Sequence, residues 1–109
     1  MDLNTLQVEH EAWERRNFPD SADNVFHSLA GMTEELGELA HAVLKAEQGI
    51  RGSEAKHMME AGDAVGDIFI YCAGLCNKLG LDMDFEVTKA WKQVKARDWN
   101  TNKESGKVA

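Results

Sequence analysis

The chain has 109 residues, which suits one domain with a modest core. Its 19 acidic and 12 basic residues give a formal net charge of −7, which disfavours direct binding to nucleic-acid phosphates or to an anionic membrane surface. Apolar residues make up 43%, there is one proline, and helix-forming residue types are abundant, so we predict an all-α fold. No segment has the roughly 18 apolar residues of a membrane span and no secretory signal opens the chain, so we expect a cytoplasmic location.

The first two predicted helices cover residues 3–17 and then about 22 or 23 to 48. The first ends before Pro19, because the residue that precedes a proline disfavours helical backbone. Its expected packing positions are Leu3, Leu6, Val8 and Trp13. Apolar residues of the second helix recur every three or four positions, which marks one helical face. That face consists of Val25, Leu29, Met32, Leu36, Leu39 and Val43.

The third and fourth predicted helices cover residues 54–78 and about 83 or 84 to 97. Gly49 stops the second helix and Ser53 is the expected N-cap of the third. Four helices with short turns predict a four-helix bundle-like domain over residues 1–99, followed by a polar, frayed tail over 100–109. The second half of the third helix is apolar nearly all round, so we expect it to be buried in the bundle or in the interface of an obligate dimer or tetramer.

A stripe of carboxylates on the third helix needs an explanation. Glu60, Asp63 and Asp67 are three and four residues apart, and Tyr71 continues their stripe. No lysine or arginine lies within a turn of Asp63 or Asp67, although like charges at this spacing repel one another. The simplest resolution is a bound cation, because Mg²⁺ takes oxygen ligands from a few carboxylates, phosphates and water.

The second helix offers partners for that stripe in the segment TEELGELAH. On a helical wheel Glu35 lies at the edge of the apolar face, Glu38 lies about one turn further on, and Glu34 points outward. By itself, a run of three glutamates on a helix usually faces solvent. Two antiparallel helices that each offer two inward carboxylates could together hold a divalent cation, Mg²⁺ or Mn²⁺.

These two acidic segments resemble a known family. Residues 34–38, EELGE, resemble the EExxE element of the MazG-type all-α nucleoside triphosphate pyrophosphohydrolases. Residues 65–71, VGDIFIY, resemble the latter part of the family's second acidic element, and NKLGLDMD resembles the turn after it. KARDW, residues 95–99, resembles the basic C-terminal element, so the resemblance covers roughly residues 25–99.

The resemblance implies hydrolysis of a (deoxy)nucleoside triphosphate to a monophosphate and pyrophosphate by a Mg²⁺-dependent homodimer or homotetramer, with no nucleic acid or membrane as partner. Carried over, Glu35, Glu38 and Asp67 are metal ligands, and Glu34 or Glu38 helps to deprotonate the attacking water. Tyr71 lies near the base or sugar. The candidate phosphate contacts are Lys89, Lys92, Lys95 and Arg97, and we expect the contact from the last three.

The sequence departs from the family pattern at Ala64, where the family has a glutamate three residues before the aspartate. Asp63, four residues before Asp67, lies on the same side of the helix, so we expect it to replace the missing ligand, with Glu60 as the alternative. The family's asparagine and lysine before the final arginine have no clear counterpart either. Their places hold Ala90 and Gln93.

Two other interpretations remain open from the sequence. Glu38 and His41 form an E-x-x-H pair of the kind found in di-iron carboxylate bundles, but those sites need two such pairs and the chain has one. A non-catalytic helical interaction module, whose acids only solvate a face, is the other. The remaining histidines have no partner at ligand spacing and are expected at the surface or boundary. The sequence leaves open which nucleotide is preferred and whether the role is house-cleaning of the nucleotide pool.

Overall fold

The computed structural model describes residues 1–108, and within them it contains helices and turns but no strand. The helices are α1 (Leu3–Asn17), α2 (Val25–Gln48), α3 (Glu54–Leu79) and α4 (Met83–Lys95). The prediction of an all-α chain with four helices is therefore confirmed. Residue 109, the last of the predicted tail, lies outside the described residues.

Each helix begins at a side chain that accepts a hydrogen bond from a backbone N–H two or three residues further on. These N-caps are Asp2, Asn24, Ser53 and Asp82. Because Asn24 caps α2, that helix begins two or three residues later than predicted. The helices α2 and α3 end at Gly49 and Gly80, whose φ angles of 68° and 69° are left-handed and favour glycine.

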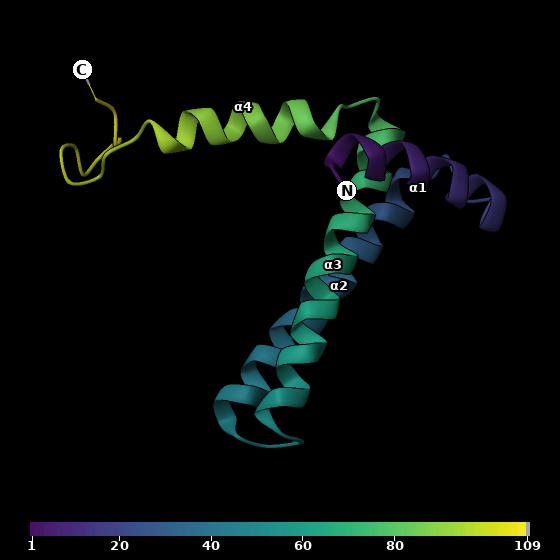
Figure 1. Cartoon of the computed structure of the whole chain (residues 1–109), viewed down its shortest axis with the longest axis horizontal. Coiled ribbons are helices and arrows are strands. Elements are labelled where there is room, and N and C mark those ends of the chain that lie inside the picture. The colour runs from purple at the N-terminus through teal and green to yellow at the C-terminus, as the bar shows by residue number, and fades with distance from the viewer. Residues whose placement is uncertain (109) are drawn as a thin grey trace.

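The two longest helices form an antiparallel hairpin (Figure 1). The residues buried along the hairpin are mostly small, such as Ser28, Ala42, Ala64 and Gly74, and small side chains let two helix axes approach closely. The larger apolar side chains stay about half exposed on its outside, among them Leu29, Leu36, Val43, Val65 and Phe69. One chain therefore does not bury these apolar faces, and the prediction that they are buried in an oligomer interface stays a prediction.

The first helix packs across the C-terminal end of α3. Ala73, Cys76 and Met83 form a small core there, covered by Leu3, Leu6 and Cys72. The side chain of Gln7 fixes this corner, because its Nε2 donates to the Leu81 carbonyl at 2.7 Å and its Oε1 accepts from the Met83 N–H at 2.8 Å. Val8, a predicted packing position, is exposed instead.

The fourth helix extends away from the hairpin (Figure 1). The radius of gyration is 17.5 Å, whereas a compact domain of this length has about 13 Å. One chain therefore makes a hairpin, a crossing helix and a projecting arm, and it does not complete a four-helix bundle by itself.

The segment after α4 forms a hydrogen-bonded loop. The helix ends at Lys95 rather than at residue 97, and the chain then closes a loop in which the Asp98 N–H donates to the Gly106 carbonyl at 2.7 Å. The Asp98 carboxylate accepts from the Asn100 and Thr101 N–H groups and from the Thr101 hydroxyl. These hydrogen bonds close the loop after α4, and the fraying of the tail stays a prediction.

Among residues 1–108 no single helix has both the length and the hydropathy needed to cross a membrane. The sequences of α3 and α4 meet that test only as a pair, and the two helices are bent by 108° relative to each other.

Candidate acidic site beside an aromatic cleft

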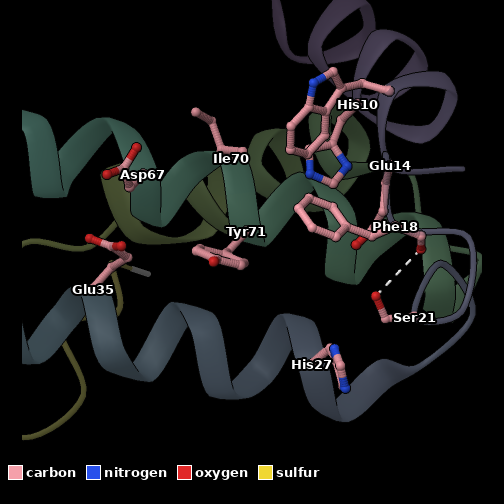
Figure 2. Close-up of a pocket in the computed structure, with 10 residues that line it drawn as sticks. His10, Glu14, Phe18, Ser21, His27, Glu35, Asp67, Ile70 and Tyr71 are labelled. Atoms are coloured by element: carbon pink, nitrogen blue, oxygen red, sulfur yellow. Dashed lines mark hydrogen bonds between the residues drawn. The ribbon is translucent and has the colours of Figure 1, made fainter. Parts of the chain in front are cut away.

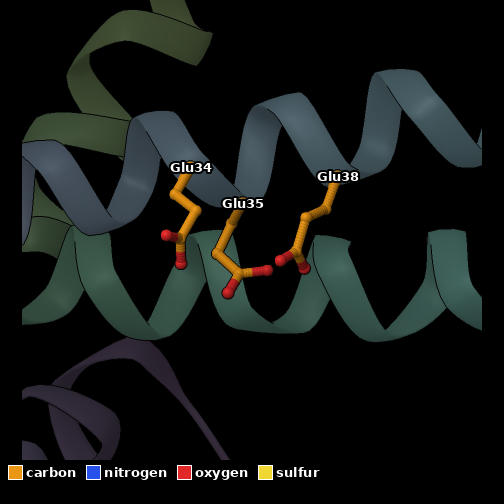
Figure 3. Close-up of side chains that lie close together, drawn as sticks. All are labelled: Glu34, Glu35 and Glu38. Carbon is orange, nitrogen blue, oxygen red and sulfur yellow. The ribbon is translucent and has the colours of Figure 1, made fainter.

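Three glutamates of α2 converge in the middle of the hairpin (Figure 3). Glu34, Glu35 and Glu38 each offer a carboxylate oxygen, and these oxygens lie within 4.8 Å of one another. Glu34 and Glu38 are exposed, whereas Glu35 is only 9% exposed. The Oε2 atom of Glu35 is buried without a hydrogen-bond partner. A buried carboxylate oxygen without a partner costs free energy, so the binding of a proton or a cation at this atom is favourable.

A cleft of about 450 Å³ opens beside this group, between α1, α2, α3 and the loop that joins α1 to α2 (Figure 2). Glu35 of α2 and Asp67 of α3 lie at one end, next to Tyr71. The other end is rich in rings, which come from His10, Trp13, Phe18 and His27. The cleft therefore joins an acidic end to an aromatic end.

The carboxylates at the acidic end affect the pKa of Glu35 and of Tyr71. Burial raises the pKa of Glu35, and the neighbouring carboxyl of Glu38 and the charges of Asp67 and Glu34 raise it further. The pKa of the Tyr71 phenol is also raised, first by burial and then by the charges of Glu35, Glu34 and Asp67. Tyr71 therefore keeps its proton at neutral pH and remains a hydrogen-bond donor in the cleft.

The structure brings together most of the acids predicted for the site, but it does not bring Asp63 into the group. Asp63 is exposed, while Glu60 interacts with Lys56 at 3.8 Å and His57 at 3.6 Å. Ala64, at the position of the family glutamate, is 2% exposed and lies seven residues before Tyr71, on the face that contacts α2. The assignment of Asp63 as a metal ligand therefore stays a prediction.

The three basic residues predicted to bind phosphate are not near the cleft of their own chain. Lys92 and Lys95 lie in the last turns of α4, and Arg97 follows the helix; all three are exposed. Because α4 extends away from the hairpin (Figure 1), these cations and the acidic end stay apart within one chain.

Sequence reasoning missed two buried groups beside the cleft, His10 and an ion pair, and also His57 at the turn between α2 and α3. His10 was expected at the surface or boundary but is buried, with its ring 5.8 Å from that of Trp13, and burial lowers its pKa. It continues the stripe of Leu3 and Leu6 at helical spacing, and that spacing was the available signal. His57 is likewise buried, and its Nε2 lies 2.9 Å from the Ile50 carbonyl.

The second missed group is a buried ion pair. The side chain of Lys78 is 2% exposed, and its Nζ lies 3.0 Å from the Glu14 carboxylate and 2.7 Å from the Ser28 hydroxyl. It joins α1, α2 and α3 behind the aromatic end of the cleft. No local sequence pattern predicts this contact, because Lys78 is 64 residues from Glu14 and 50 residues from Ser28.

Gly31 sets the position of Tyr71, because a Cβ built at residue 31 would overlap the tyrosine ring. Gly31→Ala should therefore displace the ring and destabilise the protein by about 1–3 kcal/mol, the usual cost of overpacking. Gly37→Ala is the matched control on the same helix, since its Cβ would meet nothing within 4 Å. It should stabilise the protein by about 0.5–1 kcal/mol. Urea unfolding measures both, and equal effects would contradict the close contact at residue 31.

No protein-family model, curated protein or solved structure matches this chain. The function is therefore argued from the site.

Proposed function

We propose that this protein is a Mg²⁺-dependent nucleoside triphosphate pyrophosphohydrolase, which converts a (deoxy)nucleoside triphosphate into the monophosphate and pyrophosphate. The observation that carries the proposal is the buried, unpartnered carboxylate oxygen of Glu35, within a group of acids that opens into a partly aromatic cleft. A cytoplasmic location, where nucleoside triphosphates are abundant, is part of the proposal.

The donor set fits a hard divalent cation. The three side chains that converge, Glu34, Glu35 and Glu38, offer only oxygen atoms, which suits Mg²⁺ or Mn²⁺. His41 is exposed and outside the group, so nothing here favours the di-iron alternative. Glu35, Glu38 and Asp67 would hold the ion, with Asp63 as the predicted fourth ligand. A bound Mg²⁺ supplies positive charge that offsets the charge of the triphosphate and of the departing pyrophosphate.

The acidic end can also handle the proton of the reaction. A water molecule attacks the α-phosphorus, the bond from that phosphorus to the bridging oxygen breaks, and pyrophosphate leaves. An exposed carboxylate, Glu34 or Glu38, accepts the proton that the water loses. Tyr71, which stays protonated, donates a hydrogen bond to the substrate.

The aromatic end suits the nucleoside. Flat rings of Trp13, Phe18 and Tyr71 line a cleft of about 450 Å³, within the range of about 300–1,000 Å³ that is usual for small-molecule sites. Stacking on such rings contributes about 1–3 kcal/mol per base and is tolerant of base identity. This lining supports a nucleotide rather than inorganic triphosphate as the substrate.

Hydrolysis in ¹⁸O-labelled water tests the proposal. We expect the purified protein to release pyrophosphate from at least one common or damaged (deoxy)nucleoside triphosphate, with the label in the monophosphate and with activity lost on chelation of Mg²⁺. Release of orthophosphate and a diphosphate would show cleavage at another bond. If no nucleotide is cleaved and Mg²⁺ does not raise the melting temperature, the interaction-module alternative replaces this proposal.

A further inference from the structure

We propose that α4 is an arm exchanged between two copies of this chain, and that it brings Lys95 and Arg97 to the rim of the other copy's acidic cleft. The docking does not depend on catalysis. Only the role of these cations as partners of a bound triphosphate rests on the proposed function.

The distribution of charge supports a contact between the arm and a hairpin. Residues 89–107 carry six basic and two acidic side chains, a net charge of +4, whereas residues 1–88 carry six basic and seventeen acidic side chains, a net charge of −11. The acidic part includes the exposed Glu34, Glu38 and Asp63 of the hairpin. The positive end of the arm with the loop after it, residues 89–107, and the negative hairpin attract each other at moderate ionic strength.

Apolar surface supports the same contact. Val87, Trp91 and Val94 lie on one face of α4, at spacings of four and three residues, and Trp91 is 59% exposed. A helix of 13 residues is marginal in water without packing. The hairpin exposes complementary apolar side chains next to its acids, including Leu36, Val65 and Phe69, the last of which is 49% exposed.

The arm cannot reach the hairpin of its own chain. The turn between α3 and α4 is held by hydrogen bonds from Gln7 to Leu81 and from Met83 to Gln7. This turn directs α4 away from the hairpin (Figure 1), and folding back would break these bonds. A second copy is therefore the partner that can bury both surfaces.

The position of the cations on the arm sets the register of docking. Lys95 is one turn after Trp91 on the same side of α4, so it lies beside the apolar face that docks. Lys89 lies on the opposite side, where it is paired with Glu86 at 2.9 Å and sits over the Phe85 ring. Lys78 lies behind the aromatic end of the cleft and is already paired with Glu14, so it does not supply a cation to the acidic rim.

Cross-linking of mixed isotopes tests the exchange without nucleotide or Mg²⁺. Equal amounts of ¹⁴N- and ¹⁵N-labelled protein are mixed in denaturant, refolded together and treated with a carbodiimide, which joins lysine amines to nearby carboxylates. We expect cross-linked peptide pairs that join Lys95 to Glu34, Glu38 or Asp63. In about half of these pairs one peptide should carry ¹⁴N and the other ¹⁵N. Only all-light and all-heavy cross-links, or none between these segments, would overturn the proposal.

A pair of variants tests the register by sedimentation. The wild type should have at least twice the chain mass of 12.1 kDa at micromolar concentration. Lys95→Glu should raise the dissociation constant of the assembly tenfold or more at low salt, whereas Lys89→Glu, with the same change in charge, should change it less than twofold. A monomeric wild type or equal effects of both variants would overturn the proposal. Hydrolysis by a monomer would remove this inference and leave the proposed function standing.

Discussion

Glu35→Gln is expected to abolish Mg²⁺-dependent pyrophosphate release while leaving the fold intact. The change removes the buried carboxylate oxygen that has no partner in the protein, and it preserves the volume of the side chain. Loss of a charged ligand that holds the catalytic ion amounts to several kcal/mol of transition-state stabilisation, which corresponds to a fall in rate of about a hundredfold or more. Pyrophosphate release measures the rate, and circular dichroism checks the helices.

The same variant should change how stability depends on pH. Because the pKa of Glu35 is raised in the folded state, the folded protein holds this proton more tightly than the unfolded chain does. The stability that the protonated group provides is fully present below its ordinary pKa of 4.5 and is lost as the pH rises through the folded value. In the absence of metal, the melting temperature of Glu35→Gln should match the wild type near pH 4 and exceed it at higher pH, with the difference constant once the pH is above the folded pKa.

Glu47→Gln is the matched control, because Glu47 is an exposed glutamate of α2 outside the acidic group. It should leave the rate of pyrophosphate release and the pH profile of stability unchanged. Mg²⁺ should raise the melting temperature of the wild type and of this control, but not that of Glu35→Gln. A Glu35→Gln protein that keeps its activity and its response to Mg²⁺ would show that the ion binds elsewhere.

Lys78→Met should be the most destabilising single change among those considered. The change removes the Lys78 ammonium, whose Nζ lies 3.0 Å from the Glu14 carboxylate and 2.7 Å from the buried Ser28 hydroxyl. The Glu14 side chain, which is only 16% exposed, then has a charge without a partner. Breaking a buried ion pair from one side costs about 3 kcal/mol or more, because the other charge stays buried. For a chain of this length the melting temperature should fall by roughly 10–15 °C.

A double mutant separates the pair from its surroundings. Adding Glu14→Gln to Lys78→Met removes the stranded charge and should recover much of the lost stability, since the two effects are coupled through one contact. Lys56→Met is the control, because its contact with Glu60 is exposed and 3.8 Å long, and it should cost under about 1 kcal/mol. If thermal unfolding shows Lys78→Met to be no worse than Lys56→Met, the pair does not hold the three helices together.

The sequence alone was sufficient for the four helices and for most of their ends. Periodic apolar residues, the cap at Ser53 and the glycine at 49 act within a few residues of themselves, and the structure confirms each. The pairing of two acidic segments was also predictable in part, because helical spacing places Asp67 and Tyr71 on one side of α3. The metal and the reaction remain proposals.

Only the tertiary structure decided which faces meet. The apolar periodicity of α2 pointed to Leu29, Leu36 and Val43 as the packing face, yet the hairpin closes through small residues, because these allow a closer approach of the two axes. The same close approach buries Glu35 without a partner and brings Lys78 to Ser28, and the packing of α1 on α3 brings Glu14 to Lys78. Contacts between residues 50 or more positions apart depend on how helices cross, and periodicity within one helix carries no information about that crossing.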